Sequence, residues 1–194
     1  MPARTPKNFD MLYRDHVDLM YRFANRLCGE PDAAQDLVQE TFLNAYRGFK
    51  KFRGDAQIST WLYTIASRAC LRMRRRRKGA PERELSLDEF IPTSEGEFRL
   101  QIPVDGLSPE EALQNKELRQ ALDAAIDKLP KKYKMVLVLR DMEGLGAKEV
   151  GIIMGLNERA VKSRLHRARL FVRRELSARG ITDATDAHDH ERLK

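Results

Sequence analysis

Residues 147–174 read AKEVGIIMGLNERAVKSRLHRARLFVRR, and this stretch indicates two helices joined by a tight turn. Gly155, Leu156 and Asn157 separate two apolar patterns, and Asn157 is a favourable N-cap for the helix that follows. A short helix, a tight turn and a longer helix are the components of a helix-turn-helix. Apolar residues at three- and four-residue steps predict the buried side of the second helix. These residues are Val161, Leu165, Ala168 and Val172.

The outer face of this second helix is predicted to be cationic. Arginine can pair bidentately with guanine in the major groove, whereas lysine and serine can reach phosphates. A basic outer face on the second helix of such a pair therefore favours insertion into DNA. The alternative is a basic helix whose outer face is only solvated. The residues predicted on or beside this face are Arg159, Lys162, Ser163, Arg164, His166, Arg167 and Arg169.

Helical spacing also organises the rest of the chain. Apolar residues recur at helical steps over 9–27, 31–49 and 58–69, and the third segment continues into the basic run 72–78. Further helices are predicted at 113–129, 132–142, 147–154 and 158–178, and no segment has strand-like alternation. We therefore predict an all-α protein with two small helical domains, 8–78 and 113–178. An acidic linker, 79–112, joins them, and a polar tail, 179–194, follows.

The charge of the chain is distributed in blocks. The 194 residues include 36 Lys and Arg and 29 Asp and Glu, for a net charge of +7. Residues 1–78 and 118–180 each carry +8, whereas residues 79–117 carry −7 and residues 181–194 carry −2. A basic block attracts polyanions, and nucleic acid is the first candidate. The alternative is ordinary solvated helix surface.

Several classes of protein are disfavoured by the sequence. No apolar run approaches the ~18 residues that a membrane span needs, so we expect no direct membrane insertion. The N-terminus lacks the apolar stretch of a secretory signal. The two cysteines and four histidines form no ligand set, and the tail triplet His188-Asp189-His190 lacks further ligands. Phosphate-binding glycine loops are absent. We therefore expect a cytoplasmic protein that is not an enzyme and has no cofactor or metal.

Three groups of motifs resemble the extracytoplasmic-function, or group 4, sigma factors of the sigma-70 family. DLVQETF at 36–42 is similar to their core-polymerase-binding helix. FRGD at 52–55 and TWLYTIA at 60–66 are similar to their promoter-melting segment. The motifs of 129–145 and VKSRLHRAR at 161–169 are similar to the region that reads the −35 element. The motifs occur in the order typical of the family.

The resemblance implies a role for each motif. The residues implied in binding the polymerase core are Asp36, Gln39, Glu40 and Phe42. Those implied in −10 recognition and melting are Lys51, Phe52, Arg53, Gly54, Asp55, Gln57, Tyr63, Arg68, Arg72, Arg75 and Arg76. The basic outer face described above is implied in −35 recognition. The implied function is that of an alternative sigma factor that directs core polymerase to promoters, begins strand opening and is controlled by an anti-sigma factor.

Three positions call for separate predictions. Trp61 is in step with the apolar residues of its helix and is predicted to be core, whereas Tyr63, 200° away, is predicted to be freer. Arg68 stands where many relatives have asparagine, which bears on the −10 base preference. Gly151 stands where relatives often have alanine, and we predict that it weakens its helix by up to ~1 kcal/mol.

Two other functions are compatible with parts of the sequence. A helix-turn-helix regulator that does not bind core polymerase would not need the 36–42 motif or the basic segment 50–78. A sigma mimic that titrates an anti-sigma factor could lose its DNA-contacting arginines, which this chain keeps. The acidic linker is predicted either to thread a basic channel of the polymerase or to dock on the protein's own domains. Its stranded apolar residues are Leu87, Phe90 and Ile91.

Overall fold

The computed structural model describes residues 8–52, 54, 57–78 and 109–181, with side chains described outside 74–78 and 109–115. All of the regular structure in these ranges is helical, and no strand occurs in them. This confirms the predicted all-α class. The predictions for the linker apolar residues Leu87, Phe90 and Ile91, and for the histidines of the tail, concern positions outside the described residues.

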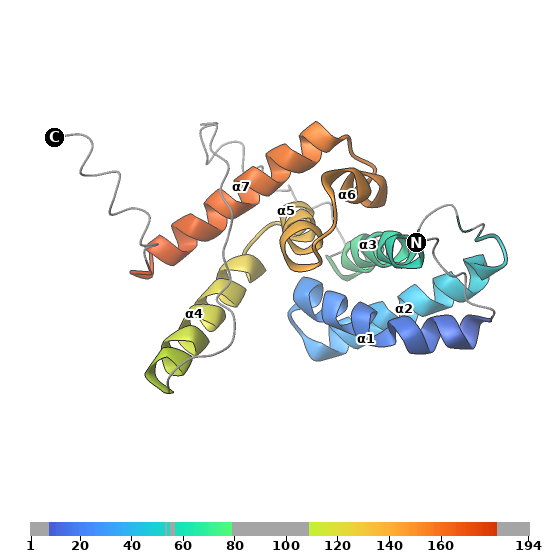
Figure 1. The fold of residues 1–194 in the computed structure, drawn as a ribbon, viewed down its shortest axis with the longest axis horizontal. Helices are drawn as coiled ribbons and strands as arrows, with labels where there is room; N and C mark the ends of the chain where they lie inside the picture. The colour runs from blue at the N-terminus through green and yellow to red at the C-terminus, as the bar shows by residue number, and fades with distance from the viewer. Residues whose placement is uncertain (1–7, 53, 55–56, 79–108, 182–194) are drawn as a thin grey trace.

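The N-terminal domain is a three-helix bundle of α1 (Phe9–Cys28), α2 (Pro31–Phe49) and α3 (Ile58–Lys78) (Figure 1). Asn8 caps α1 by accepting a hydrogen bond from the Met11 backbone N–H at 3.0 Å. Gly29 ends α1 with φ of 77°, a left-handed conformation that glycine adopts without strain. Pro31 then begins α2, where its missing N–H costs nothing. The sequence therefore sets the limits of this domain locally.

The C-terminal domain contains α4 (Pro109–Asp127), α5 (Lys131–Leu137), η2 (Val138–Met142), α6 (Ala147–Met154) and α7 (Glu158–Ser177). α4 begins before the predicted domain start at residue 113, and α6 has the predicted limits. α5, α6 and α4 all pack against the long α7. The core is formed by fully buried residues of these helices, among them Tyr133, Met135, Val136, Leu139, Val150, Val161, Ala168 and Val172.

The predicted helix 132–142 changes its winding partway along. Its first part is α-helical, but Val138–Met142 forms one turn of π-helix, η2. The Glu143 N–H donates to the Val138 carbonyl oxygen at 2.9 Å, five residues back. A π turn contains an additional residue, so the residues after it point in different directions from those of a continuous α-helix. The π turn thereby sets the direction of Glu143.

The two domains pack directly against each other. α3 lies against α6, and the end of α1 lies against α5 and η2 (Figure 1). The buried residues of the two domains form one continuous apolar cluster. The predicted division into two domains thus describes the local folding units, whereas the structure shows them in a closed arrangement.

Candidate nucleic-acid and protein interfaces

The stretch 147–174 forms the predicted helix-turn-helix. α6 ends at Met154 and is capped by Gly155, which has φ of 66°, and α7 begins after Asn157. The side-chain oxygen of Asn157 accepts a hydrogen bond from the Ala160 N–H at 2.8 Å, so it caps α7 as predicted. The four residues predicted to face the core from α7, Val161, Leu165, Ala168 and Val172, are buried.

The outer face of α7 is basic, but its residues differ in exposure. Arg159 and Lys162 are exposed, whereas Ser163, Arg164 and Arg167 are half-buried along the same helix. His166 is also half-buried, and its Nε2 is buried without a hydrogen-bond partner. Two exposed cations of α7, Arg159 and Lys162, thus lie in its first two turns, whereas exposed Arg174 lies near its other end. The N-terminal end of a recognition helix is the one that reaches base edges in the major groove.

Arg169 is partly buried between α7 and η2. Its Nε donates to Asp141 at 2.8 Å and its Nη2 donates to the other Asp141 oxygen at 2.6 Å. Both side chains are 13% exposed. The sequence predicts Arg169 beside the outer basic face, whereas in the structure its guanidinium faces Asp141, and this bidentate ion pair joins α7 to η2.

Gly151 occupies a position where the two helices approach closely. A Cβ at this residue would lie 2.6 Å from the Leu156 carbonyl oxygen, a backbone atom. The Leu156 N–H donates to the Gly151 carbonyl oxygen at 2.8 Å, so the turn folds back onto α6 at this point. The helix-propensity cost of Gly151 stays a prediction, and the structure adds that the absence of a side chain permits the turn.

The 36–42 motif lies on α2. Asp36 and Gln39 are exposed, and Glu40 is half-buried. The Glu40 carboxylate accepts a hydrogen bond from the Asn44 side chain at 2.9 Å and lies 3.7 Å from the Arg72 guanidinium. α2 therefore presents an acidic and polar face to solvent.

An apolar groove borders this face between α1 and α2. Phe42 is only 5% exposed, and its ring packs edge-on against Tyr13, with centroids 4.7 Å apart. Leu43 and Tyr46 remain exposed beside it. The groove is lined by Phe9, Tyr13, Gln35, Val38, Gln39, Phe42, Leu43 and Tyr46. The exposed apolar side chains extend the polar face of α2 into a mixed surface suited to a protein partner.

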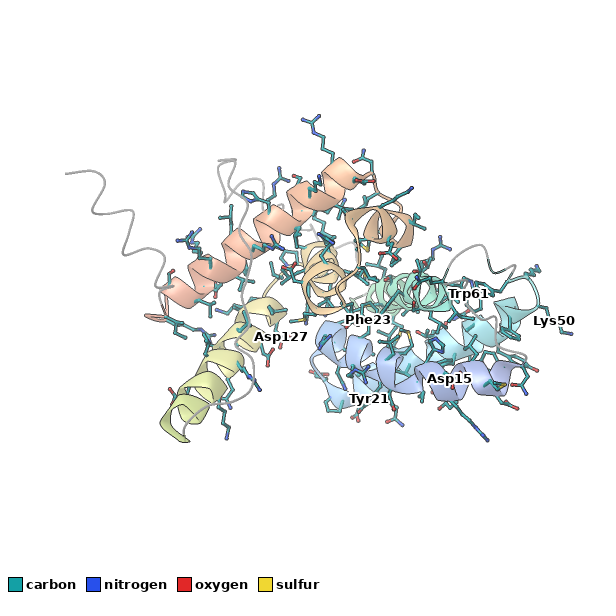
Figure 2. All side chains as sticks on the ribbon, in the orientation of Figure 1. Asp15, Tyr21, Phe23, Lys50, Trp61 and Asp127 are labelled. Carbon is teal, nitrogen blue, oxygen red and sulfur yellow. The ribbon has the colours of Figure 1, made fainter. Side chains whose placement is uncertain are left out.

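The loop before α3 is anchored by aromatic packing. Phe52 stacks on Trp61 with ring centroids 4.8 Å apart, and Figure 2 shows Trp61 on α3 near the loop that follows Lys50. Gly54 is exposed and has φ of 77°. Lys51, Gln57, Arg68 and Arg72 are also exposed. The predicted contacts of Arg53, Asp55, Arg75 and Arg76 concern residues whose side chains are not described.

Tyr63 faces the interior, contrary to the prediction that it is freer than Trp61. It is 3% exposed, and its ring packs against Phe23 of α1 with centroids 4.9 Å apart. Its hydroxyl donates a hydrogen bond to the Glu143 carboxylate at 2.6 Å. Burial, followed by this hydrogen bond, raises the pKa of the Tyr63 hydroxyl well above its ordinary value, so the group stays protonated. Trp61 is only half-buried, so its assignment to the core was also too strong.

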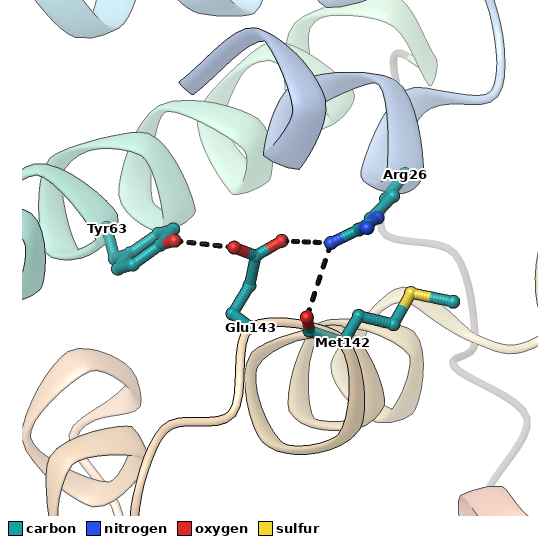
Figure 3. Close-up of polar contacts among 4 residues, drawn as sticks. All are labelled: Arg26, Tyr63, Met142 and Glu143. Atoms are coloured by element: carbon teal, nitrogen blue, oxygen red, sulfur yellow. Dashed lines mark hydrogen bonds and ion pairs between the residues drawn. The ribbon is translucent and has the colours of Figure 1, made fainter. Parts of the chain in front are cut away.

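The residues that join the two domains were missed by the sequence prediction. Glu143 receives the Tyr63 hydroxyl on one oxygen and the Arg26 guanidinium on the other, at 2.5 Å (Figure 3). The Lys131 ammonium donates to the Leu27 carbonyl oxygen at the end of α1. No local periodicity points to contacts between residues 80 or more positions apart. In the sequence, Glu143 stands out only as a charged residue within the 129–145 motif.

No three His, Cys, Asp or Glu side chains of the described residues are grouped so that they could hold a metal ion. None of the helices in the described ranges is sufficiently long and apolar to span a membrane.

The arrangement of helices is similar to that of two solved proteins. It matches the sigma factor RpoE in complex with the anti-sigma factor NepR from Bartonella quintana, with a TM-score of 0.61 and 22% identity, over 89% of this chain and 98% of RpoE. It also matches CnrH in complex with the cytosolic domain of CnrY, with a TM-score of 0.59 and 21% identity, over 90% and 92% of the two chains. These similarities establish the fold.

The sequence itself establishes the family. Residues 12–80 match Sigma-70 region 2, and residues 119–172 match Sigma-70 region 4. The chain is 36% identical over 166 residues to the ECF RNA polymerase sigma factor SigW of Bacillus subtilis, and the aligned residues cover 85% of each protein. It is 32% identical over 180 residues to the ECF RNA polymerase sigma factor SigE of Mycolicibacterium smegmatis, and the aligned residues cover 93% of this chain and 66% of SigE. The chain therefore belongs to the extracytoplasmic-function sigma factors of the sigma-70 family.

Proposed function

We propose that this protein is an alternative sigma factor that directs RNA polymerase core to specific promoters and begins strand opening. The observation that carries the proposal is the presence, in one chain, of a helix-turn-helix with exposed cations on α7 and a polar, acidic face on α2. The protein then supplies recognition and strand separation in the cytoplasm, and the polymerase supplies the chemistry of RNA synthesis. It is not itself an enzyme and needs no cofactor.

We assign the separate tasks to the two domains. Residues 8–78 bind the core and the −10 element, and residues 113–178 bind the −35 element. The side chain of Arg169 is not part of this assignment, because it is held by Asp141. Tyr63 takes part in melting only after it leaves its contact with Glu143. An anti-sigma factor is a further proposed partner, since the similar fold of RpoE was solved with NepR bound.

The test is a run-off transcription assay with purified core polymerase and promoter fragments. Promoter-specific transcripts that require both the core and this protein are expected. A protein that binds promoter DNA alone and adds no transcript would instead be a helix-turn-helix regulator. A protein that binds an anti-sigma factor but neither core nor promoter would be a sigma mimic.

Replacement of Glu40 by lysine is expected to weaken core binding about tenfold, because a basic partner surface would meet like charge. Loss of ~1.4 kcal/mol corresponds to this factor. The measurement is the equilibrium binding of labelled protein to core, and the matched control is Asp18→Lys on the exposed side of α1. Helical content by circular dichroism should be unchanged in both. Binding of Glu40→Lys that equals the binding of Asp18→Lys would remove Glu40 from the interface.

Replacement of Arg164 or Arg167 by alanine is expected to weaken binding to the −35 duplex. Loss of an arginine that reads a base should cost ~1–3 kcal/mol of binding free energy and relax specificity at one position. Lys162→Ala should instead weaken binding to all sequences alike and lower the salt dependence by about one phosphate contact. The assay is promoter binding by holoenzyme at several salt concentrations, with the exposed Arg174→Ala as the control. Parental affinity in both arginine variants would show that the recognition helix is misassigned.

A further inference from the structure

One carboxylate connects the two domains. Glu143, directly after η2, accepts the Tyr63 hydroxyl from α3 at 2.6 Å and pairs with Arg26 of α1 at 2.5 Å. Arg26 also donates to the Met142 carbonyl oxygen at 3.5 Å (Figure 3). Two helices of the N-terminal domain thus hold a single residue of the C-terminal domain.

The burial of these groups makes the contact specific to the closed arrangement. The Glu143 side chain is 6% exposed, Tyr63 is 3% exposed, and Arg26 is 39% exposed. A buried carboxylate without partners is strongly unfavourable, so Glu143 tolerates its burial only because Tyr63 and Arg26 satisfy it. If one partner is removed, the closed arrangement retains an unpaired polar group, whereas the open arrangement lets water solvate it.

The closed arrangement is incompatible with simultaneous reading of both promoter elements. The −35 and −10 positions lie about 25 bp apart, or roughly 85 Å at about 3.4 Å per base pair. In the closed protein the melting helix α3 lies directly against α6, and the whole of α7 measures only about 30 Å at 1.5 Å per residue. The intervening 79–108 segment has enough residues for separation, since 30 residues reach at most about 100 Å when extended.

We propose that Glu143 is a latch that keeps the free protein closed through Arg26 and Tyr63, and that release of this latch is required before the protein can engage a promoter. The latch keeps the protein closed without a bound inhibitor, because both sides of the contact belong to this chain. It withholds Tyr63 from DNA until the domains separate. The promoter consequence rests on the proposed function, whereas the latch itself does not.

A latch reduces activity by lowering the fraction of competent molecules. The apparent affinity of a partner for the open form falls in proportion to the open fraction. Removing the charged hydrogen bonds of Glu143 is expected to lower the closed-to-open ratio by about tenfold to a hundredfold. Promoter complexes formed at limiting protein should increase in parallel with the open fraction.

The test uses single-molecule energy transfer between dyes on cysteines placed at the exposed Asp18 of α1 and Ser177 of α7. Cys28 and Cys70 are replaced by alanine in every protein. Glu143→Ala and Arg26→Ala approach the same contact from opposite domains, so misfolding of one domain cannot explain a shift in both. If the two residues act on each other, the double variant should open little further than either single variant.

The matched control is Glu175→Ala. This variant also removes an ion pair, the one between Glu175 and Lys128 at 2.5 Å, but both of these residues lie within the C-terminal domain. An open population that increases in Glu143→Ala and Arg26→Ala but not in Glu175→Ala supports the latch. Equal open populations in all three overturn it.

The consequence for promoter binding is tested separately with core polymerase and promoter DNA. More promoter complexes at limiting Glu143→Ala protein support the requirement for release. If the domains open but complex formation does not increase, this requirement is overturned. Failure of the unsubstituted protein to transcribe with core would contradict the proposed function, whereas the energy-transfer result would still decide whether Glu143 holds the domains together.

Discussion

Replacement of Arg169 by alanine is expected to lower the free energy of unfolding of the C-terminal domain by about 3 kcal/mol. The reason is the Asp141 carboxylate, which is 13% exposed in the parent protein and would lose two hydrogen bonds of 2.6 and 2.8 Å. Breaking a buried ion pair by removing one partner costs more than removing both, because the remaining charge has no compensation. The measurement is urea unfolding followed by circular dichroism.

The double variant Arg169→Ala/Asp141→Ala separates this effect from lost packing. It should be more stable than the sum of the two single variants predicts, since neither charge is then left without a partner. The matched control is Arg174→Ala, an exposed arginine on the same helix, which should change stability by less than ~0.5 kcal/mol. A loss of stability in Arg169→Ala no larger than in Arg174→Ala would mean that the ion pair contributes little.

The contrast between these arginines shows what helical periodicity can determine. The spacing of apolar residues gave the helix limits, the turn at 155–157 and the buried stripe of α7, because these depend on neighbours along the chain. It could not distinguish Arg169 from Arg164. Both are cations beside the stripe, and only the position of Asp141 on η2 draws one of them inward.

The burial of Tyr63 also could not be predicted from helical periodicity alone. A helical wheel places Tyr63 away from Trp61, and this angle is correct. The surface on that side of α3 is not solvent, however, because α1 supplies Phe23 and the second domain supplies Glu143. Trp61 is drawn instead toward Phe52 of the loop. Contacts between segments that are distant in sequence therefore decided which aromatic residue was buried, and the π turn that directs Glu143 had no signature in the periodicity.

Gly151 lies where α6 and the following turn approach closely, so its replacement should strongly affect stability. Replacement by alanine is expected to destabilise the C-terminal domain by about 2–3 kcal/mol, although alanine is the better helix former by ~1 kcal/mol. The new Cβ would lie 2.6 Å from the Leu156 carbonyl oxygen, and a backbone atom cannot rotate away as the end of a side chain can. Separation of the turn from α6 would also lengthen the 2.8 Å hydrogen bond from the Leu156 N–H to the Gly151 carbonyl oxygen.

Gly146→Ala is the control, because Gly146 lies at the start of the same helix with φ of −66°, which alanine adopts without strain. Its Cβ would approach only the end of the flexible Glu149 side chain, at 3.2 Å. We expect this variant to unfold within ~0.5 kcal/mol of the parent in urea. Because the turn orients α7 relative to α6, Gly151→Ala should also weaken −35 binding, whereas Gly146→Ala should not. If Gly151→Ala instead stabilises the domain, helix propensity outweighs the close approach, and the turn can shift by a few tenths of an ångström without cost.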